Sequence, residues 1–327
     1  MKWFTTALAL SAAIFATSEG RRCFFEEGSG RGISSYSRHL PDDCTQLTLE
    51  GPLEEDAHHQ LGMALKDHPG LWSLILRNNT IGHRGAATIA KGLKANTVLA
   101  HLEIQNNNVG DRGAIAIADA FKTNTAVTDL VLSNTGLGPR GVAALAEMLK
   151  VTTTLERLAL NGNEMKISGA TAIAEALTVN TCLSSLIITS DPIGDDGAAA
   201  IAEALKDNAK LLTLQLAGCE IEDFGASSLA EVLKVNTVLS RLGLSNNKIG
   251  DIGTTAIAEA LKVNIGLEEL HLSNNGIGYI GVAALSRSMK LNRNMVELVL
   301  DEKKLNDGSA SSKSILASLK RNNRGEL

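Results

Sequence analysis

The stretch that decides the fold is LSRLGLSNNKIGDIGTTAIAEALKVNIG, residues 239–266. A 28-residue unit of this kind recurs without a slip, and a unit that cannot bury its own apolar side must stack on neighbours. The sequence therefore predicts a solenoid over residues 71–322. Its nine copies begin at Leu71, Leu99, Val127, Leu155, Leu183, Leu211, Leu239, Leu267 and Met295.

The first half of each copy has the pattern of a short strand. Positions 1, 4 and 6 are aliphatic, as in Leu239, Leu242 and Leu244, while positions 2, 3 and 5 vary. This alternation indicates a strand with one buried face. Position 11 is also aliphatic, as in Ile249, so we expect the loop that leaves the strand to return to the core.

The second half of each copy has the pattern of an amphipathic helix. Apolar residues occupy positions 16, 19, 20 and 23, which gives the i, i+3, i+4, i+7 spacing of one helical face. Glycine at position 15, such as Gly253, marks a place where the backbone bends or approaches another segment closely. Asn at position 9, such as Asn247, is expected to bond backbone groups of the turn, and Asn at position 26, such as Asn236, to close the helix in a left-handed conformation.

Stacking such units dictates an architecture. Paired strands lie about 4.8 Å apart, whereas packed helices need about 8–10 Å. The prediction is an α/β horseshoe with a parallel sheet on the concave face and helices on the convex face. Residues 43–70 are expected to form a degenerate N-terminal capping repeat and the ninth copy a C-terminal cap, with a lead-in at 19–42 and a tail at 323–327.

The pattern LxxLxLxxNxIGxxGAxxIAxxLxxN resembles the ribonuclease-inhibitor-like class of leucine-rich repeats over residues 71 to about 322. The unbroken period and the IAEALK helices are most similar to the repeat arrays of nucleotide-binding immune receptors and their free-standing microbial and protist counterparts. Members of this class act through protein contact. The resemblance therefore implies a binding module rather than an enzyme.

The N-terminus has the pattern of a secretory signal peptide over residues 1–18, with Lys2, an apolar stretch and then small residues. Alternatives are an uncleaved membrane anchor and a chance apolar start, but the stretch is short of the ~20 residues that span a bilayer. We expect secretion, with no stable membrane insertion after cleavage. A net charge of −5 without a basic stripe argues against nucleic acid as a partner.

Export would allow covalent modification. Cys23 and Cys44 are predicted to form a disulfide that staples the segment before the repeats, whereas Cys182 and Cys219 fall at opposite sheet edges and are expected to stay unpaired. The sequon at Asn78 could carry a glycan. The tail Arg324–Leu327 matches the last two positions of an endoplasmic-reticulum retrieval signal, which leaves the reticulum lumen as an alternative location.

The sequence has no strong signature of catalysis. No GxxxxGK[ST], HExxH, CxxC or GxSxG motif occurs, so no catalytic residue, cofactor or metal site is predicted. His58 and His59 lie near acidic residues, but neighbours on a helix point in different directions.

The variable strand positions are the predicted recognition face, because parallel alignment stacks them in columns. Trp72, Ile75 and His101 could form an aromatic anchor, unless the N-terminal cap covers Trp72. An acidic end that includes Asp301 and Glu302 could steer a basic partner, or serve only as a solvated face. The candidate protein-binding residues are Trp72, Ile75, His101, Glu103, Glu156, Arg157, Arg241, Glu268, Glu269, His271 and Glu297.

The leading hypothesis is a secreted module that binds a protein partner through the concave face, in the host–microbe or immune setting that the resemblance suggests. One alternative is a GTPase-activating regulator, for which Arg77 and Arg84 are the candidates. Others are a ribonuclease-inhibitor-type regulator and a cytoplasmic fragment of an immune receptor. The partner's identity does not follow from the sequence.

Overall fold

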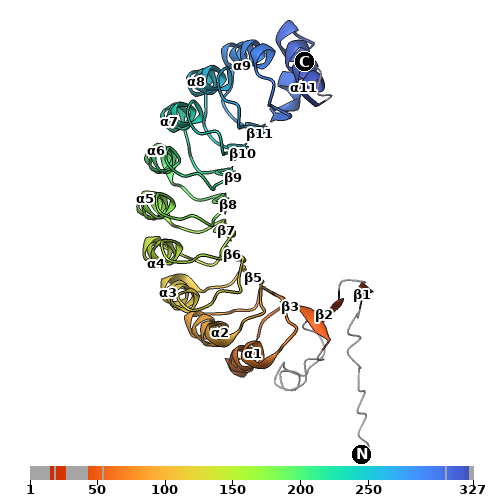
Figure 1. Ribbon diagram of the computed structural model, residues 1–327, viewed down its shortest axis with the longest axis vertical. Coiled ribbons are helices and arrows are strands. Elements are labelled where there is room, and N and C mark those ends of the chain that lie inside the picture. The colour runs from red at the N-terminus through yellow and green to blue at the C-terminus, as the bar shows by residue number, and fades with distance from the viewer. Residues whose placement is uncertain (1–14, 18–19, 27–42, 54, 306–307, 324–327) are drawn as a thin grey trace, which may run out of the picture. The chain divides into compact units, whose positions relative to one another are not determined.

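The computed structural model describes residues 15–17, 20–26, 43–53, 55–305 and 308–323. The chain divides into two compact units, Met1–Thr135 and Gly136–Leu327, called unit 1 and unit 2 below. In each unit a layer of helices covers one side of a parallel sheet (Figure 1). We call the opposite side of each sheet the strand face.

In unit 1, strands β3 to β6 pair in parallel and in chain order, so that each residue faces its equivalent one repeat later. Strand β2 pairs in parallel with β3, and β1 pairs antiparallel with β2. The strands are β1 (Phe15–Thr17), β2 (Gly20–Glu26), β3 (Cys44–Glu50), β4 (Ser73–Arg77), β5 (His101–Gln105) and β6 (Asp129–Ser133). The helices are α1 (Glu55–Asp67), α2 (His83–Ala95) and α3 (Gly110–Phe121).

Unit 2 repeats the same strand–helix alternation with three-residue strands, again paired in parallel with a 28-residue register. The strands are β7 (Arg157–Ala159), β8 (Ser185–Ile187), β9 (Thr213–Gln215), β10 (Arg241–Gly243), β11 (Glu269–His271) and β12 (Glu297–Val299). The helices are α4 (Pro139–Leu149), α5 (Lys166–Leu177), α6 (Gly194–Ala204), α7 (Asp223–Leu233), α8 (Asp251–Leu261), α9 (Tyr279–Leu291), α10 (Glu302–Leu305) and α11 (Ala310–Asn323). The predicted α/β repeat solenoid is confirmed.

The core lies between the two layers. Leu239, Leu242, Leu244 and Ile249 are at most 1% exposed, as the periodicity of positions 1, 4, 6 and 11 predicts. Position 15 is a site of close approach rather than of unusual backbone angles: a Cβ on Gly253 would lie 2.8 Å from the Cβ of Ala226 in the preceding helix. Glycine here allows consecutive helices to pack closely.

The expectation for position 26 is wrong. These asparagines are not left-handed: Asn96, for example, has φ −80° and ψ 133°. Instead the buried side chain joins two repeats. Asn236 accepts hydrogen bonds from the backbone N–H groups of Val238 and Leu239 at 3.0 and 2.8 Å, and its Nδ2 donates to the carbonyl of Leu205 at 2.7 Å. Most of the left-handed residues other than glycine are at position 8, such as Asn246 with φ +58°, and the others are at positions 10 and 12.

Position 9 forms a second buried ladder, as predicted. The Oδ1 atom of Asn247 accepts from the N–H groups of Cys219 and Ile221 in the preceding repeat, at 2.9 and 3.1 Å. Its Nδ2 donates to the carbonyl of Leu216 at 2.8 Å. Each asparagine therefore satisfies donors and an acceptor of a turn that lacks regular backbone pairing.

Asp191 breaks this ladder because a carboxylate has no proton to donate. It is fully buried, and its oxygens accept from Asn163 and Met165 at 3.0 Å each. Burial raises the pKa of Asp191, although the two backbone hydrogen bonds oppose that rise. The charged form is therefore less favoured here than in the unfolded chain.

Asp191→Asn is expected to raise the free energy of unfolding by about 1 kcal/mol at pH 7, because a single amide oxygen can accept both hydrogen bonds, as that of Asn247 does, and a buried charge is removed. A raised folded-state pKa makes Asp191 increasingly destabilising as pH rises from the unfolded-state pKa through the folded-state pKa. The gain should therefore shrink as pH falls from 7 through the raised folded-state pKa, and it should be small at about pH 4 and below. Urea unfolding of both proteins at pH 7 and pH 4 measures it, and an equal gain at both pH values would contradict the explanation.

The C-terminal end of the solenoid also differs from the regular repeat. Helix α11 packs on α9, and its Arg321 donates to the carbonyls of Met289 and Asn292 at 3.2 and 2.8 Å. These contacts satisfy carbonyls that a further repeat would otherwise bond.

Four features bear on export. Most of the expected signal peptide and of the lead-in falls outside the described residues, although β2 adds part of the lead-in to the sheet. Cys23 and Cys44 are joined, with Cα atoms 6.2 Å apart. Cys182 and Cys219 are both free thiols. Among the described helices, none has the length and apolar character needed to cross a membrane.

Candidate functional site

The strand face of unit 1 brings Trp72, Ile75 and His101 around one hollow, as the column argument predicts. The hollow measures about 400 Å³, and Gln46, Thr128 and Asp129 also line it. Trp72 keeps 44% of its surface exposed, so the described residues of the N-terminal cap do not cover it. We call this feature the Trp72 hollow.

A chain of alternating charges borders the hollow, and we call it the His101 cluster: Arg77, His101, Glu103 and Asp129. Arg77 Nε lies 2.7 Å from Glu103 Oε1, and His101 Nε2 lies 3.7 Å from Glu103 Oε2. His101 Nδ1 lies 2.9 Å from Asp129 Oδ2. The register of β4, β5 and β6 accounts for these contacts, because His101 faces Asp129 directly and Glu103 lies two residues along the same strand.

The two carboxylates set the charge of His101. The hydrogen bond to Asp129, supported by Glu103, raises the pKa of His101 to about 9 against the opposing effect of burial. The imidazolium of His101 and the guanidinium of Arg77 lower the pKa of Glu103 to about 2. At neutral pH the cluster therefore holds two cations and two anions, with no net charge.

His101→Gln is expected to lower the free energy of unfolding by about 1–2 kcal/mol at pH 6, a figure reduced for partial exposure. Because the folded-state pKa of His101 is raised, its contribution is complete below its unfolded-state value of about 6.5 and is lost as pH rises through about 9. The difference between the two proteins should therefore largely vanish by about pH 10. Chemical denaturation at both pH values measures it. A constant difference would show that His101 is not held as an imidazolium.

A second polar group lies on the strand face of unit 2. Arg241 on β10 bonds Glu269 on β11, with Nε 2.9 Å from Oε1. His271 Nε2 lies 3.5 Å from Glu297 Oε1 on β12, and Ser240 Oγ donates to Glu268 at 3.3 Å. Among the described residues, Glu269, His271 and Glu297 are the one set of His, Cys, Asp or Glu side chains with metal-ligand spacing.

The remaining predicted residues are more dispersed. Glu156 and Arg157 lie at the β7 end of unit 2, three strands from Arg241 in the sheet order β7-β8-β9-β10. Asp301, predicted for the acidic end, accepts a hydrogen bond from the backbone of Asn274 at 2.5 Å and therefore serves the turn. Glu302 begins α10 and is exposed.

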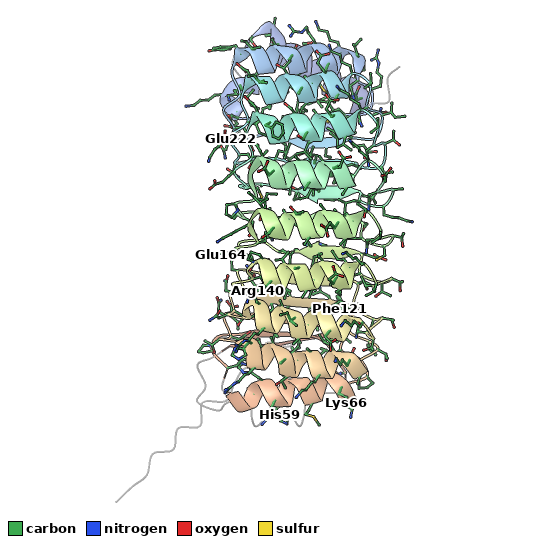
Figure 2. All side chains as sticks on the ribbon, turned by 90° about the vertical axis from the view of Figure 1, so that its left-hand side faces the viewer. His59, Lys66, Phe121, Arg140, Glu164 and Glu222 are labelled. Atoms are coloured by element: carbon green, nitrogen blue, oxygen red, sulfur yellow. A yellow bond between two sulfur atoms is a disulfide. The ribbon has the colours of Figure 1, made fainter. Side chains whose placement is uncertain are left out.

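The two arginines considered for a GTPase-activating role are in different settings. Arg77 is bound to Glu103 on the strand face, whereas Arg84 lies in the first turn of α2. His58 is buried and His59 is exposed, in agreement with their divergent directions on α1. Figure 2 shows His59 on the helix layer, which is the side opposite the strand face.

Thr128 and Asp129 were expected on the recognition face as variable strand positions, but not in the aromatic anchor, and Gln46 was not among the predicted residues. A signal for Asp129 was present, since Ser73, His101 and Asp129 occupy position 3 of three consecutive repeats. Position 3 therefore places a histidine beside an aspartate on adjacent strands. Thr128 occupies position 2 of its repeat, the same position that Trp72 occupies two repeats earlier.

The family comparison matches the repeats. A family model described as "Leucine Rich repeat" matches residues 95–118, 123–146, 179–202, 207–230, 235–258 and 263–286. No curated protein sequence matches the chain.

Two solved structures are similar to parts of this chain. A chain titled "Leiomodin-1 Actin-Binding Site 2 (ABS2)" is 20% identical with a TM-score of 0.42, and the match covers 49% of this chain and 91% of that one. The tropomodulin C-terminal domain of Caenorhabditis elegans is 14% identical with a TM-score of 0.40, and the match covers 49% and 94%. The six family matches, together with the strand–helix register of 28 residues, show that the chain contains leucine-rich repeats.

Proposed function

We propose that this chain is an exported recognition protein of the ribonuclease-inhibitor-like subclass that binds a protein partner through its strand face, with the Trp72 hollow as the anchor. The observation that carries the proposal is the exposure of Trp72 beside a hollow of about 400 Å³. Exposed aromatic residues next to a hollow are the groups that most often dominate binding energy.

The His101 cluster suits an anchor site because its side chains are already held in place. Arg77, Glu103, His101 and Asp129 are fixed by one another, so a partner need not immobilise them on binding. The cluster has no net charge, which favours a partner that inserts an apolar or aromatic side chain and hydrogen-bonds to the rim.

The acidic residues of unit 2 suit a different role. Glu268 and Glu297 are exposed, and such charges change the rate at which an oppositely charged partner associates more than the final affinity. We propose that they steer a partner whose approaching surface is basic.

Export is supported by the pattern of residues 1–18 and by the position of two cysteines. The Cα atoms of Cys23 and Cys44 lie 6.2 Å apart, within the range for a disulfide, and such a bond persists in an oxidising compartment. Asn78 is exposed and accessible to glycosylation. Expression of the full chain with a C-terminal tag tests this: we expect secreted protein whose first residue is near Glu19, whereas cytosolic protein that retains Met1 would contradict export.

The binding role is tested by filling the hollow. Thr128 lines the hollow and is half-buried, so Thr128→Arg should block it without entering the core. Tagged wild-type and variant chains would be used to capture partners from the extracellular fluid of the native source. We expect the variant to recover at least about tenfold less of the partner, and the exposed loop control Thr153→Arg to recover as much as wild type. Equal capture by all three chains would contradict recognition through the hollow.

A further inference from the structure

Three potential metal ligands converge on the strand face of unit 2. Glu269 and His271 lie two residues apart on β11 and so project to the same side, and Glu297 on β12 faces Glu269 in the register. One ligand atom from each of the three side chains lies within 4.8 Å of the others. We call this group the His271 triad.

The observation that points to a bound ion is the state of the Nε2 atom of His271. Its Nε2 atom is shielded from solvent and has no hydrogen-bond partner in the described residues, although it lies 3.5 Å from Glu297 Oε1. A shielded nitrogen left without a partner costs free energy, and such atoms call for a physical explanation. An ion bonded to this nitrogen and to the carboxylates would remove that cost.

The strand next to β11 has no side chain of its own opposite His271. On the neighbouring strand β10, the position that faces His271 is Gly243, which has no side chain. The side chain of Gln215 covers Gly243 instead. Arg241 holds Oε1 of Glu269, which leaves the other carboxylate oxygen of Glu269 for a ligand.

The donor set selects the class of ion. Imidazole nitrogen and carboxylate oxygen are both zinc ligands, with bonds of about 2.0–2.2 Å, and a zinc ion held by three protein ligands keeps one position open for water. Two ligands bound in this way to a tetrahedral ion lie about 3.3 Å apart, close to the 3.5 Å between His271 and Glu297. Calcium requires six to eight oxygens and magnesium an octahedral oxygen shell, so neither fits three ligands that include nitrogen.

We propose that Glu269, His271 and Glu297 bind one divalent transition-metal ion of the zinc type, with the remaining coordination position open. The site lies on the strand face but does not depend on the partner binding proposed above. Metal binding and partner capture are measured separately, so failure of one is distinguishable from failure of the other.

The test is titration of the full chain, purified with a tag that contains no histidine, with zinc chloride alone in a calorimeter. We expect saturation at one ion per chain, and binding weaker by at least about tenfold in His271→Ala and in Glu297→Gln. Glu268→Gln removes an equal charge next to the triad and should change affinity less than about twofold. The three substituted residues are half-buried or exposed, and circular dichroism would verify that each variant remains folded.

Spectroscopy identifies the ligand directly. On addition of zinc, the ring-nitrogen resonances of His271 should shift before those of the other histidines, such as His58 and His59. Absence of saturable binding up to about 1 mM zinc, or undiminished binding in His271→Ala, would overturn the proposal.

Discussion

Trp72→Ala is expected to weaken partner binding by at least about 30-fold, which corresponds to about 2 kcal/mol. The indole provides a large rigid surface next to the Trp72 hollow, and burying such a surface at the centre of an interface excludes water from the neighbouring polar contacts. Stability should change by only about 1 kcal/mol or less, since the side chain is already 44% exposed. Binding of the chain to immobilised partner, and calorimetric titration in solution, would measure the affinity.

Two further variants make this prediction specific. Trp72→Phe keeps an aromatic ring and should retain part of the affinity. Tyr279→Ala removes an aromatic side chain that is 89% exposed at the start of α9, and it should leave the affinity unchanged. A Trp72→Ala chain that binds as tightly as wild type would show that the hollow is not the anchor.

Asn236→Ala should lower the local stability of the repeats around it by about 2–4 kcal/mol. The substitution leaves the N–H groups of Val238 and Leu239 and the carbonyl of Leu205 buried without their partner. Asn236→Asp should cost a similar amount at neutral pH, because it keeps the acceptors but loses the Nδ2 donor and buries a charge. Local opening at a cost of this size is visible in hydrogen exchange.

Hydrogen exchange provides the measurement and its control. The amides of Val238 and Leu239 should exchange at least about 30-fold faster in Asn236→Ala than in wild type. Asn294, which is half-exposed in the loop before β12, is the matched control, and its change to alanine should alter these rates little. Unchanged protection at Val238 and Leu239 would mean that the ladder at position 26 does not hold the repeats together.

The repeat architecture could be predicted because each structural requirement recurs in every copy. A strand residue such as Leu242 and a glycine such as Gly253 are repeated at a fixed spacing, so the requirement for burial or close approach is visible in one sequence. The conformation of Asn236 was not predictable in this way. Asparagine is common both in left-handed turns and in side-chain bridges, and only the structure shows that the carbonyl of Leu205 lies within its reach.

The candidate site was predictable in part. The stacking of positions 2, 3 and 5 placed Trp72, Ile75 and His101 together, because the register between strands equals the repeat length. The pairing of His101 with Asp129 and of Arg77 with Glu103 depends on side-chain directions across strands, which the spacing alone does not specify. The His271 triad was missed for the same reason, since Glu297 is 26 residues from His271.

The central claim is that a protein partner contacts the strand face, and site-specific photo-cross-linking tests it most directly. A photoreactive phenylalanine would replace Ile75, which lines the hollow, or Ile115, which is 48% exposed on helix α3 of the same unit. We predict that the residue at 75 forms a covalent adduct with the captured partner and that the residue at 115 forms none. An adduct from position 115 but not from position 75 would contradict recognition through the strand face.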